Sequence, residues 1–389
     1  MDWLADFVEY AKHGETPEKI MYWVGVATVA GALRRKVWID QEIFQWTPNF
    51  YLLIVGPPGT IKKSTSIGVG MRLLKRVPGV NFGPQSVTWQ QLITHMADLK
   101  EKVVIEGEEF LHSSITIDLS EFGSFFDTHD QKMIDALTDL WDSKIGSFSK
   151  ETKTNGSDEI VNPWINILAC TTPRWLSKNF SEDLIGSGFG SRPIYLYAAE
   201  PKSDLAYPRR SMPPVNEMRI KRSNLVRGLS EMAEYSGEYQ ITEEAYVWGE
   251  KWYADYRARQ RSMGNSVEAG FNDRLQTHLH KLAMVLSASQ GDFPTIDAHH
   301  LAEADARLRD LDGDVKQIFG FIGQSKSSGA SREIVEILGR GWMRKRDLYK
   351  KHFFRIMSDN EFEEALNSTV AAGLVQISGA MDNLIVELR

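Results

Sequence analysis

The sequence predicts an α/β fold in which a short buried strand leads through a loop of glycine and proline into a helix. Tyr51 to Val55 is an apolar run that contains β-branched residues, as buried strands do. The loop GPPGTIKKST follows, and an amphipathic helical pattern then extends to Arg76. Such a loop directs successive backbone N–H groups toward one point, and the helix adds the positive end of its dipole. These three observations indicate a site for a triphosphate.

The spacing of this loop differs from the usual G-x-x-x-x-G-K-[ST]. Counted from Gly56, Lys62 takes the lysine position, but Lys63 then stands where a hydroxyl is needed. Alignment on Lys63 and Ser64 restores the order and makes the loop one residue longer, and we prefer it. Lys63 would hold the β- and γ-phosphates and Ser64 the Mg²⁺, with Thr65 as the alternative hydroxyl. A plain turn between a buried strand and a surface helix is the competing interpretation. The expected nucleotide-binding residues are Gly56, Pro57, Pro58, Gly59, Thr60, Ile61, Lys62, Lys63, Ser64 and Thr65.

Composition limits the possible classes of protein. The chain has 389 residues, 42% hydrophobic and 25% charged, which is enough for two or three globular domains. Its one cysteine, Cys170, excludes an internal disulfide and a cysteine-rich zinc site, and it lies in an apolar run typical of a buried thiol. The net charge of −7 means that any nucleic acid must meet local basic patches.

No membrane segment is expected. The longest apolar stretch near the start, Tyr22 to Leu33, is too short to cross a bilayer, and no basic segment precedes it as in a signal peptide. We therefore expect a cytoplasmic protein.

The first 46 residues have the spacing of helices, and Thr16-Pro17 is a good helix start. The second of these helices is expected to end at the basic residues 34–36. Cations stabilise the carboxyl end of a helix, so this role outweighs a nucleic-acid patch. After the loop helix, Ser86 to Thr88 predict the cap of a further helix from Trp89 to Leu99.

A second predicted strand ends in polar residues. It runs from Ser114 to Leu119 and is followed by Ser120 and Glu121, at the strand end where open α/β sheets place ligands. Glu121 is the candidate for activating a water molecule. Asp118, on the same strand face as Ser120, is the candidate for a carboxylate at the magnesium ion. Solvated polar residues at a strand end are the alternative.

A helix from Asp130 to Asp142 and a hairpin follow. Asn155-Gly156 between two extended arms, residues 148–163, is a strong hairpin signal. The next apolar strand, Trp164 to Cys170, ends in Thr171, Thr172 and a proline. These hydroxyls are candidates for contact with the nucleotide or for a turn before the proline.

The segment Gly186 to Pro193 surrounds one arginine with glycines. Freedom of the backbone around Arg192 suits a loop that offers a rigid cation to a phosphate, and an ion pair with a surface carboxylate is the alternative. In the first interpretation Arg192 completes the site of a neighbouring protomer.

The remainder is predicted to be mainly helical. Helices are expected at residues 216–235, 242–263, 273–289 and 295–321, and Gly323 to Gly329 has the composition of a linker. Three short helices (332–338, 344–351 and 359–372) and two strands (374–377 and 383–388) then give the pattern of a winged helix-turn-helix. The third helix is acidic, which suits a protein partner better than the major groove.

Taken in order, these motifs resemble the ring-forming ATPases of phages and integrated elements that act as primase-associated helicases, related to the superfamily 3 and AAA+ helicases. The resemblance covers roughly residues 15–290. It rests on the following segments: VGPPGTIKKST, LSEFGSFF, residues 148–163, ILACTTPRWL, GSGFGSRPIYLY and, more loosely, HLHKLAMVLS.

The resemblance implies a P-loop NTPase core of the AAA+/RecA-like kind. Residues 1–46 would be an N-terminal helical region, 47–205 the core, 206–322 a helical lid, 323–330 a linker and 331–389 the winged helix. It implies a ring, expected to be a hexamer, with ATP and Mg²⁺ at subunit interfaces. Thr171 or Thr172 would sense the γ-phosphate, and Arg192 would act in trans as a catalytic residue beside Lys63 and Glu121.

The resemblance also implies single-stranded DNA in the centre of the ring. The hairpin matches the pore hairpin of superfamily 3, which makes Lys150 and Lys153 candidate phosphate contacts. The expected function is an ATP-driven translocase or DNA helicase in replication of a mobile element. The alternative is an ATP-dependent switch or helicase loader that grips a protein partner through the winged helix.

Overall fold

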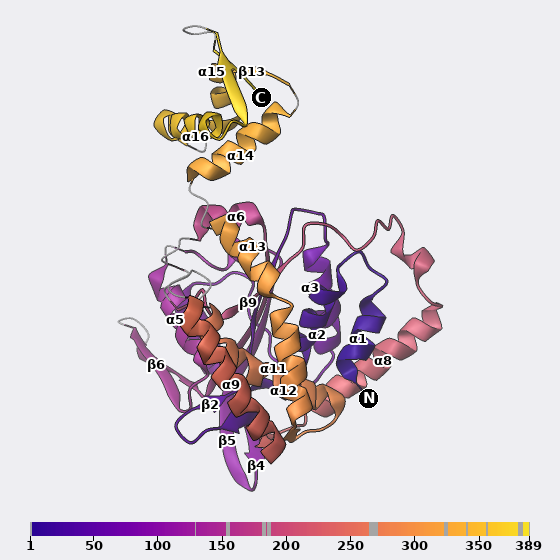
Figure 1. Ribbon diagram of the computed structural model, residues 1–389. Coiled ribbons are helices and arrows are strands. Elements are labelled where there is room, and N and C mark those ends of the chain that lie inside the picture. Colours follow the sequence, from indigo (N-terminus) through magenta and orange to yellow (C-terminus); the bar gives the residue numbers. More distant parts are fainter. Residues whose placement is uncertain are drawn as a thin grey trace. The chain divides into compact units, whose positions relative to one another are not determined.

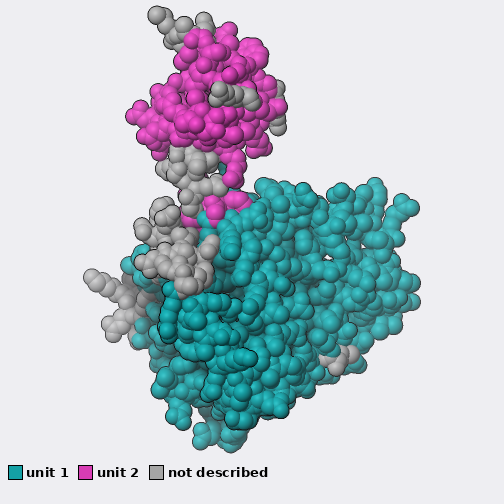
Figure 2. Space-filling model, in the orientation of Figure 1, with its two compact units in different colours: residues 1–175, 182–319 teal, residues 176–181, 320–389 magenta. Residues whose placement is uncertain are grey.

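The computed structural model describes residues 2–128, 130–152, 156–180, 184, 188–263, 271–322, 326–339, 341–354, 357–379 and 384–388. The fold is α/β, with helices packed around mixed sheets (Figure 1). The chain divides into two compact units, which are residues 1–175 with 182–319 and residues 176–181 with 320–389 (Figure 2).

A five-stranded sheet in the order β4-β5-β8-β3-β9 lies at the centre of the first unit. Its parallel strands are β3 (Tyr51–Val55), β5 (Glu108–Leu119), β8 (Pro163–Thr171) and β9 (Pro193–Tyr197). β4 (Glu101–Ile105) pairs antiparallel with β5. In register, Val55 lies opposite Thr171 on one side and Tyr197 on the other. The carboxyl ends of the parallel strands therefore meet at one edge of the sheet, where α/β proteins bind ligands.

Helices cover both faces of this sheet. α3 (Lys63–Leu74) and α2 (Glu18–Leu33) share one buried core with the even-numbered side chains of β3 and β8, Leu52 and Cys170 among them. α5 (Gln131–Asp142) lies against the other face, where the Tyr51 hydroxyl donates to the Leu137 carbonyl at 2.7 Å. Burial on both faces explains why the sequences of β3 and β8 are almost uninterrupted apolar runs.

The N-terminal region contains helices and two strands. α1 (Trp3–Ala11) is capped by the Asp2 carboxylate, and α2 follows. The expectation of helix throughout residues 1–46 is wrong beyond Lys36, since β1 (Val37–Asp40) and β2 (Gln45–Trp46) form an antiparallel pair there. Val37 and Ile39 alternate inward, and β-branched side chains favour the pleated surface.

The basic residues at the end of α2 form a short 3₁₀ turn, η1 (Arg34–Lys36), and are buried. Arg34 pairs with Glu101 of β4 at 2.5 Å, and Lys36 donates to the Ala233 carbonyl. Arg35 donates to Gln45 at 2.9 Å. These cations therefore hold β1, β2 and β4 together and do not form an exposed patch.

Two further elements stand beside the sheet. α4 (Trp89–Asp98) begins at the cap predicted from the sequence, and the structure adds a capping box, in which Thr88 and Gln91 exchange side-chain and backbone hydrogen bonds. β6 (Ser147–Thr152) and β7 (Gly156–Val161) form the predicted antiparallel hairpin, whose turn residues 153–155 lie outside the described residues. The Thr94 hydroxyl of α4 donates to Asp158 at 2.5 Å and ties β7 to α4.

The region from residue 206 to residue 322 is mainly helical, as predicted. It contains η3 (Pro208–Ser211), α8 (Val215–Met232), α9 (Glu243–Met263), α11 (Leu275–Gln290), α12 (Ala298–Arg309) and α13 (Asp312–Ile322). Short strands β10 (Gly237–Glu238), β11 (Gln240–Ile241) and β12 (Thr295–Ile296) separate the helices. The single helix expected over 295–321 is wrong, because the chain breaks at Asp310 and buries Leu311 between α12 and α13.

In its described residues from 326 onward, the second unit contains helices, one π-helical turn and a small sheet. They are α14 (Lys326–Leu338), α15 (Lys345–Leu348), η4 (Tyr349–Phe353) and α16 (Asp359–Ala371), with β13 (Met343–Arg344), β14 (Val375–Ser378) and β15 (Ile385–Leu388) in the order β13-β15-β14. α14 starts within the expected linker, because Ala330, Ile334 and Leu338 form one apolar stripe that enters the core. A short α6 (Pro173–Asn179) follows β8.

Across the described segments, every helix is either too short or too polar to span a lipid bilayer.

Candidate functional site

The loop between β3 and α3 lies at the edge where the parallel strands end. Gly59 has φ +73° and Lys62 has φ +52°, so the chain passes twice through the left-handed region before α3 begins at Lys63. Gly56 leaves no room for a side chain, because a Cβ atom there would lie 2.6 Å from the Ala198 carbonyl oxygen. The fold therefore requires glycine at the start of this loop, where the loop passes over the end of β9.

The loop presents a continuous row of backbone donors. Within the described residues, no acceptor is found for the N–H groups from Gly59 to Thr65, and Ser66 is the first to bond within the helix, to the Lys62 carbonyl at 3.0 Å. The N–H groups of the first turn of a helix have no partner inside the helix. The positive end of the α3 dipole lies at the same point, so these N–H groups suit an anion.

The two adjacent lysines point to different places. Lys63 is 9% exposed, and its ammonium donates to the carbonyls of Gly56 at 2.7 Å and Pro57 at 2.8 Å, so the ammonium lies inside the loop. Lys62 is exposed, donates to the Gly59 carbonyl at 3.2 Å and lies 3.6 Å from Glu15. Of the two alignments considered, this geometry favours the one that counts Lys63 as the phosphate-contacting lysine.

Lys63, Glu121 and Cys170 lie close together at the strand ends. Burial lowers the pKa of Lys63, and the charges of Cys170 and Glu121 act in the opposite direction. Burial also raises the pKa of the Cys170 thiol to about 12, which keeps it a structural thiol, as expected from the sequence. Glu121 is exposed, and its carboxylate makes no hydrogen bond or ion pair with any described residue. A carboxylate is therefore available next to the loop.

The two threonines after β8 have different environments. Thr171 is 1% exposed, its carbonyl accepts from the Gly56 N–H at 3.3 Å, and its hydroxyl has no hydrogen-bond partner in the part of the chain described. The Thr172 hydroxyl accepts from the Trp175 N–H at 3.2 Å and caps α6. Thr171 is thus the better placed of the two to face a ligand of the loop.

The expected metal ligands are not brought together. Ser64 and Thr65 are both exposed on the first turn of α3, and their hydroxyls have no partner among the described residues. Asp118 instead lies 3.4 Å from Lys75, which follows the other end of α3. The structure gives Asp118 no contact with Ser64, whereas the charge of Glu121 acts on Lys63 of the loop.

The N-terminal segment holds the loop in place, which the sequence did not reveal. The Thr16 hydroxyl donates to the Ile61 carbonyl at 3.1 Å, and Glu15 lies beside Lys62. Glu15 also accepts from the Leu205 N–H at 2.9 Å, after β9. These contacts join segments far apart in the chain, and a local pattern carries no signal for them.

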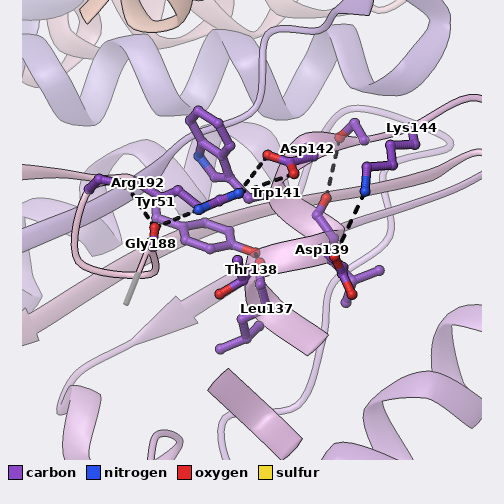
Figure 3. A network of polar contacts seen from close by, with 12 residues as sticks. Tyr51, Leu137, Thr138, Asp139, Trp141, Asp142, Lys144, Gly188 and Arg192 are labelled. Atoms are coloured by element: carbon purple, nitrogen blue, oxygen red, sulfur yellow. Dashed lines mark hydrogen bonds and ion pairs between the residues drawn. The ribbon is translucent and has the colours of Figure 1, made fainter. Parts of the chain in front are cut away.

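Arg192 occupies the opposite edge of the sheet. It precedes β9, whereas the loop follows β3, and a parallel five-residue strand spans about 15 Å. Its guanidinium donates to Asp142 and to the Gly188 carbonyl and is 3% exposed (Figure 3). A buried guanidinium held by a carboxylate does not project toward another protomer. The structure therefore shows the ion pair that was the alternative interpretation of Arg192, and a role in trans stays a prediction.

The residues expected to contact nucleic acid are only partly described. Lys150 lies in β6 opposite Asp158, but its side chain and the whole of Lys153 lie outside the described residues, as do Asn155 and Gly186. No protein-family model matches this chain, and no match is found among curated proteins.

Proposed function

We propose that this chain is an ATPase whose nucleotide binds at the loop between β3 and α3 and whose hydrolysis drives movement along nucleic acid. In this proposal residues 47–205 form a P-loop NTPase core, and residues 331–389 form a winged helix. ATP and Mg²⁺ are the expected ligands, and single-stranded DNA is the expected track.

The observation that carries the proposal is the unpaired row of N–H groups from Gly59 to Thr65 with the Lys63 ammonium beside it. A triphosphate has oxygens enough to accept from several of these donors at once, and its negative charge suits both the ammonium and the helix dipole. Pro58 and Gly59 are exposed, so the loop is open to solvent and is not closed against α3.

The chain's own residues supply the remaining roles. Lys63 would exchange the carbonyls of Gly56 and Pro57 for phosphate oxygens, which lets it hold the β- and γ-phosphates. Glu121 would orient the attacking water and draw on its proton. The buried Thr171 hydroxyl would donate to the γ-phosphate, which would satisfy a group that has no partner in the described chain.

Magnesium fits the same corner of the site. The exposed hydroxyl of Ser64, or that of Thr65, would hold the ion, and Glu121, whose charge acts on Lys63, would orient water around it. The ion would neutralise charge on the phosphate oxygens.

The proposal includes a ring assembly, which the resemblance implies and in which Arg192 would act on a neighbouring protomer. Since it lies at the sheet edge opposite Lys63, it cannot reach the nucleotide loop of its own chain. Arg192 would act in catalysis only at the site of a neighbouring protomer and only after release from Asp142. The hexamer is part of the proposal under these two conditions. Lys150 and Lys153 of the hairpin remain the proposed DNA contacts.

The test is ATP turnover with and without single-stranded DNA. The unmodified protein is expected to hydrolyse ATP and to be stimulated by the DNA. Lys63→Ala is expected to lose roughly 100-fold or more of the rate through lost phosphate binding. Glu121→Gln is expected to lose a similar factor while still binding ATP. Lys102→Ala, on the exposed face of β4, is the matched control and should turn over ATP like the parent. Absence of turnover, or turnover that survives Lys63→Ala, would overturn the proposal.

A second candidate is a partner-dependent switch or loader, favoured by the surface of α16. Asp359 and Glu364 are exposed on this helix, and Glu363 pairs with Lys345 at 2.5 Å. Acidic side chains on the third helix repel a phosphate backbone and suit a basic protein surface. Turnover that ignores DNA but rises with a partner protein would favour this candidate over the translocase.

A further inference from the structure

A second cationic cavity lies in the first unit, away from the nucleotide loop. Its volume is about 590 Å³, and three segments line it: the β1–β2 connection with β2, the carboxyl end of α5 with the residues that follow, and the amino end of α11. Asn49, which accepts a hydrogen bond from Lys281 of the cavity lining, lies two residues before β3, whereas the nucleotide loop follows β3. The cavity is therefore at the amino-terminal edge of the parallel strands.

Positive charge dominates the lining of this cavity. The ionisable lining residues are Lys144, Arg274 and Lys281 against Asp142, and Asp142 is already paired with Arg192. The Arg274 guanidinium makes no hydrogen bond or ion pair with any residue that the structure describes, and its centre lies 5.9 Å from the Trp141 ring. The Asp142 carboxylate is therefore not free to pair with Arg274, whose guanidinium lies at the cavity.

The next feature of this cavity is the buried Lys281, whose pKa depends on the charges around it. Its ammonium is 2% exposed, donates to Asn49 and lies 4.1 Å from the centre of the Trp141 ring. Burial lowers the pKa of Lys281 well below its ordinary value. Asp142 raises this pKa, and Arg192, Arg35 and Arg274 lower it further. An anion in the cavity would oppose this mutual repulsion.

Two observations independent of the charges also indicate a ligand. Trp141 lines the cavity and is 1% exposed, and its indole N–H has no acceptor within the described segments. A buried donor without an acceptor is rare in proteins. The amino end of α11 has no side-chain cap, and Gln276 and Thr277 in its first turn line the same cavity.

The cavity rim supplies a flat apolar surface. Phe44 is 45% exposed and packs edge-on against Trp46 at 5.0 Å between ring centres. Trp46 in turn stacks on His280 at 4.0 Å. Exposed aromatic rings beside cations suit a nucleobase next to its phosphate.

We propose that this cavity binds a phosphate group, carried either by a nucleic-acid strand or by a free nucleotide. Arg274 and Lys144 contact the phosphate oxygens, the Trp141 N–H and the amino end of α11 add donors, and Phe44 offers its ring to the adjoining base. This site does not depend on the nucleotide loop, so it stands or falls separately from the ATPase proposal.

The test uses the full chain with Lys63→Ala, which removes the loop lysine from every measurement. Binding of a labelled oligothymidylate is followed by fluorescence anisotropy, and binding of ADP and of inorganic phosphate by calorimetry. At least one probe should bind, and Arg274→Ala should weaken it about tenfold or more, equivalent to about 1.4 kcal/mol. Arg227→Ala, on the exposed face of α8, is the matched control and should bind like the parent.

The pattern of loss identifies the carrier of the phosphate. Weakening of the oligothymidylate alone assigns the site to a strand, and weakening of ADP or phosphate assigns it to a free anion. Lys144→Ala gives a second test at a side chain that is 72% exposed and not needed for folding, and it should weaken the same probe. The proposal is overturned if no probe binds, if Arg274→Ala and Lys144→Ala bind like the parent, or if Arg227→Ala weakens binding as much as they do.

Discussion

The Arg192 guanidinium and the Asp142 carboxylate form a buried ion pair at the amino-terminal edge of the sheet. Arg192 Nη2 lies 2.9 Å from Asp142 Oδ1 and 3.1 Å from Oδ2. The same guanidinium lies over Trp141, with 5.3 Å between its central carbon and the ring centre. Asp142 ends α5 and Arg192 precedes β9, so the pair joins the helix on one face of the sheet to the sheet itself.

Asp142→Ala should destabilise the fold. It leaves the Arg192 charge buried without its carboxylate, and removing one partner of a buried pair costs about 3 to 5 kcal/mol. We expect the low end of this range, because the Asp142 side chain is 26% exposed. Denaturant unfolding followed by circular dichroism measures the change in free energy.

Asp139→Ala is the control for this experiment. Asp139 lies on the same helix, is 51% exposed and stands 3.9 Å from Lys144, so its loss should cost less than about 0.5 kcal/mol. Equal effects of the two substitutions would show that the Arg192 pair does not hold α5 to the sheet.

Local patterns predicted the elements that carry their own signals. The apolar run of β3, the loop after Val55 and the cap of α4 were all legible from neighbouring residues. Strand β1 was missed because it directly follows a helix without a glycine or proline between them. The break at Asp310 was missed because no glycine or proline marks it there. Burial of Leu311 in the tertiary structure determines its position.

The residues of the candidate site also divide into those that a local sequence pattern indicated and those that it did not. The sequence made Lys63, Glu121 and Thr171 candidates, because each stands at the end of a predicted strand or the start of a predicted helix. It did not identify the partners Glu15 and Asp142, which meet the loop and Arg192 only through the fold. Charge pairing across the fold depends on distances that no local spacing encodes.

Acid should destabilise the first unit through His278. Burial, together with Lys281 and two arginines nearby, lowers the pKa of His278 to about 3. Between that value and about 6.5, the unfolded chain binds a proton that the folded chain does not, so stability must fall as the pH is lowered through this window. The expected slope from this group approaches about 1.4 kcal/mol per pH unit.

His278→Phe should reduce this slope, because it removes the titrating group from its aromatic surroundings. The free energy of unfolding measured at several pH values between 4.5 and 7.5 gives the slope. An unchanged slope in His278→Phe would show that His278 is not held neutral in the folded protein.

Thr171→Val should separate a catalytic hydroxyl from a structural one. The substitution removes a buried hydroxyl that has no described partner while keeping the shape of the side chain, so stability should be unchanged or rise by up to about 1 kcal/mol. ATP turnover should fall about tenfold or more if the hydroxyl donates to the γ-phosphate. Thr171→Ser, which restores the hydroxyl, should recover most of the rate. Full turnover by Thr171→Val would remove Thr171 from the mechanism.

Equilibrium binding of ATP with Mg²⁺ to the unmodified chain, to Lys63→Ala and to Lys62→Ala decides whether the loop after β3 is a nucleotide site. The unmodified chain should bind, Lys63→Ala should lose about tenfold or more in affinity, and Lys62→Ala should change little, since only Lys63 lies inside the loop. If the unmodified chain does not bind ATP, or if the two substitutions have equal effects, the loop is not the nucleotide site described above.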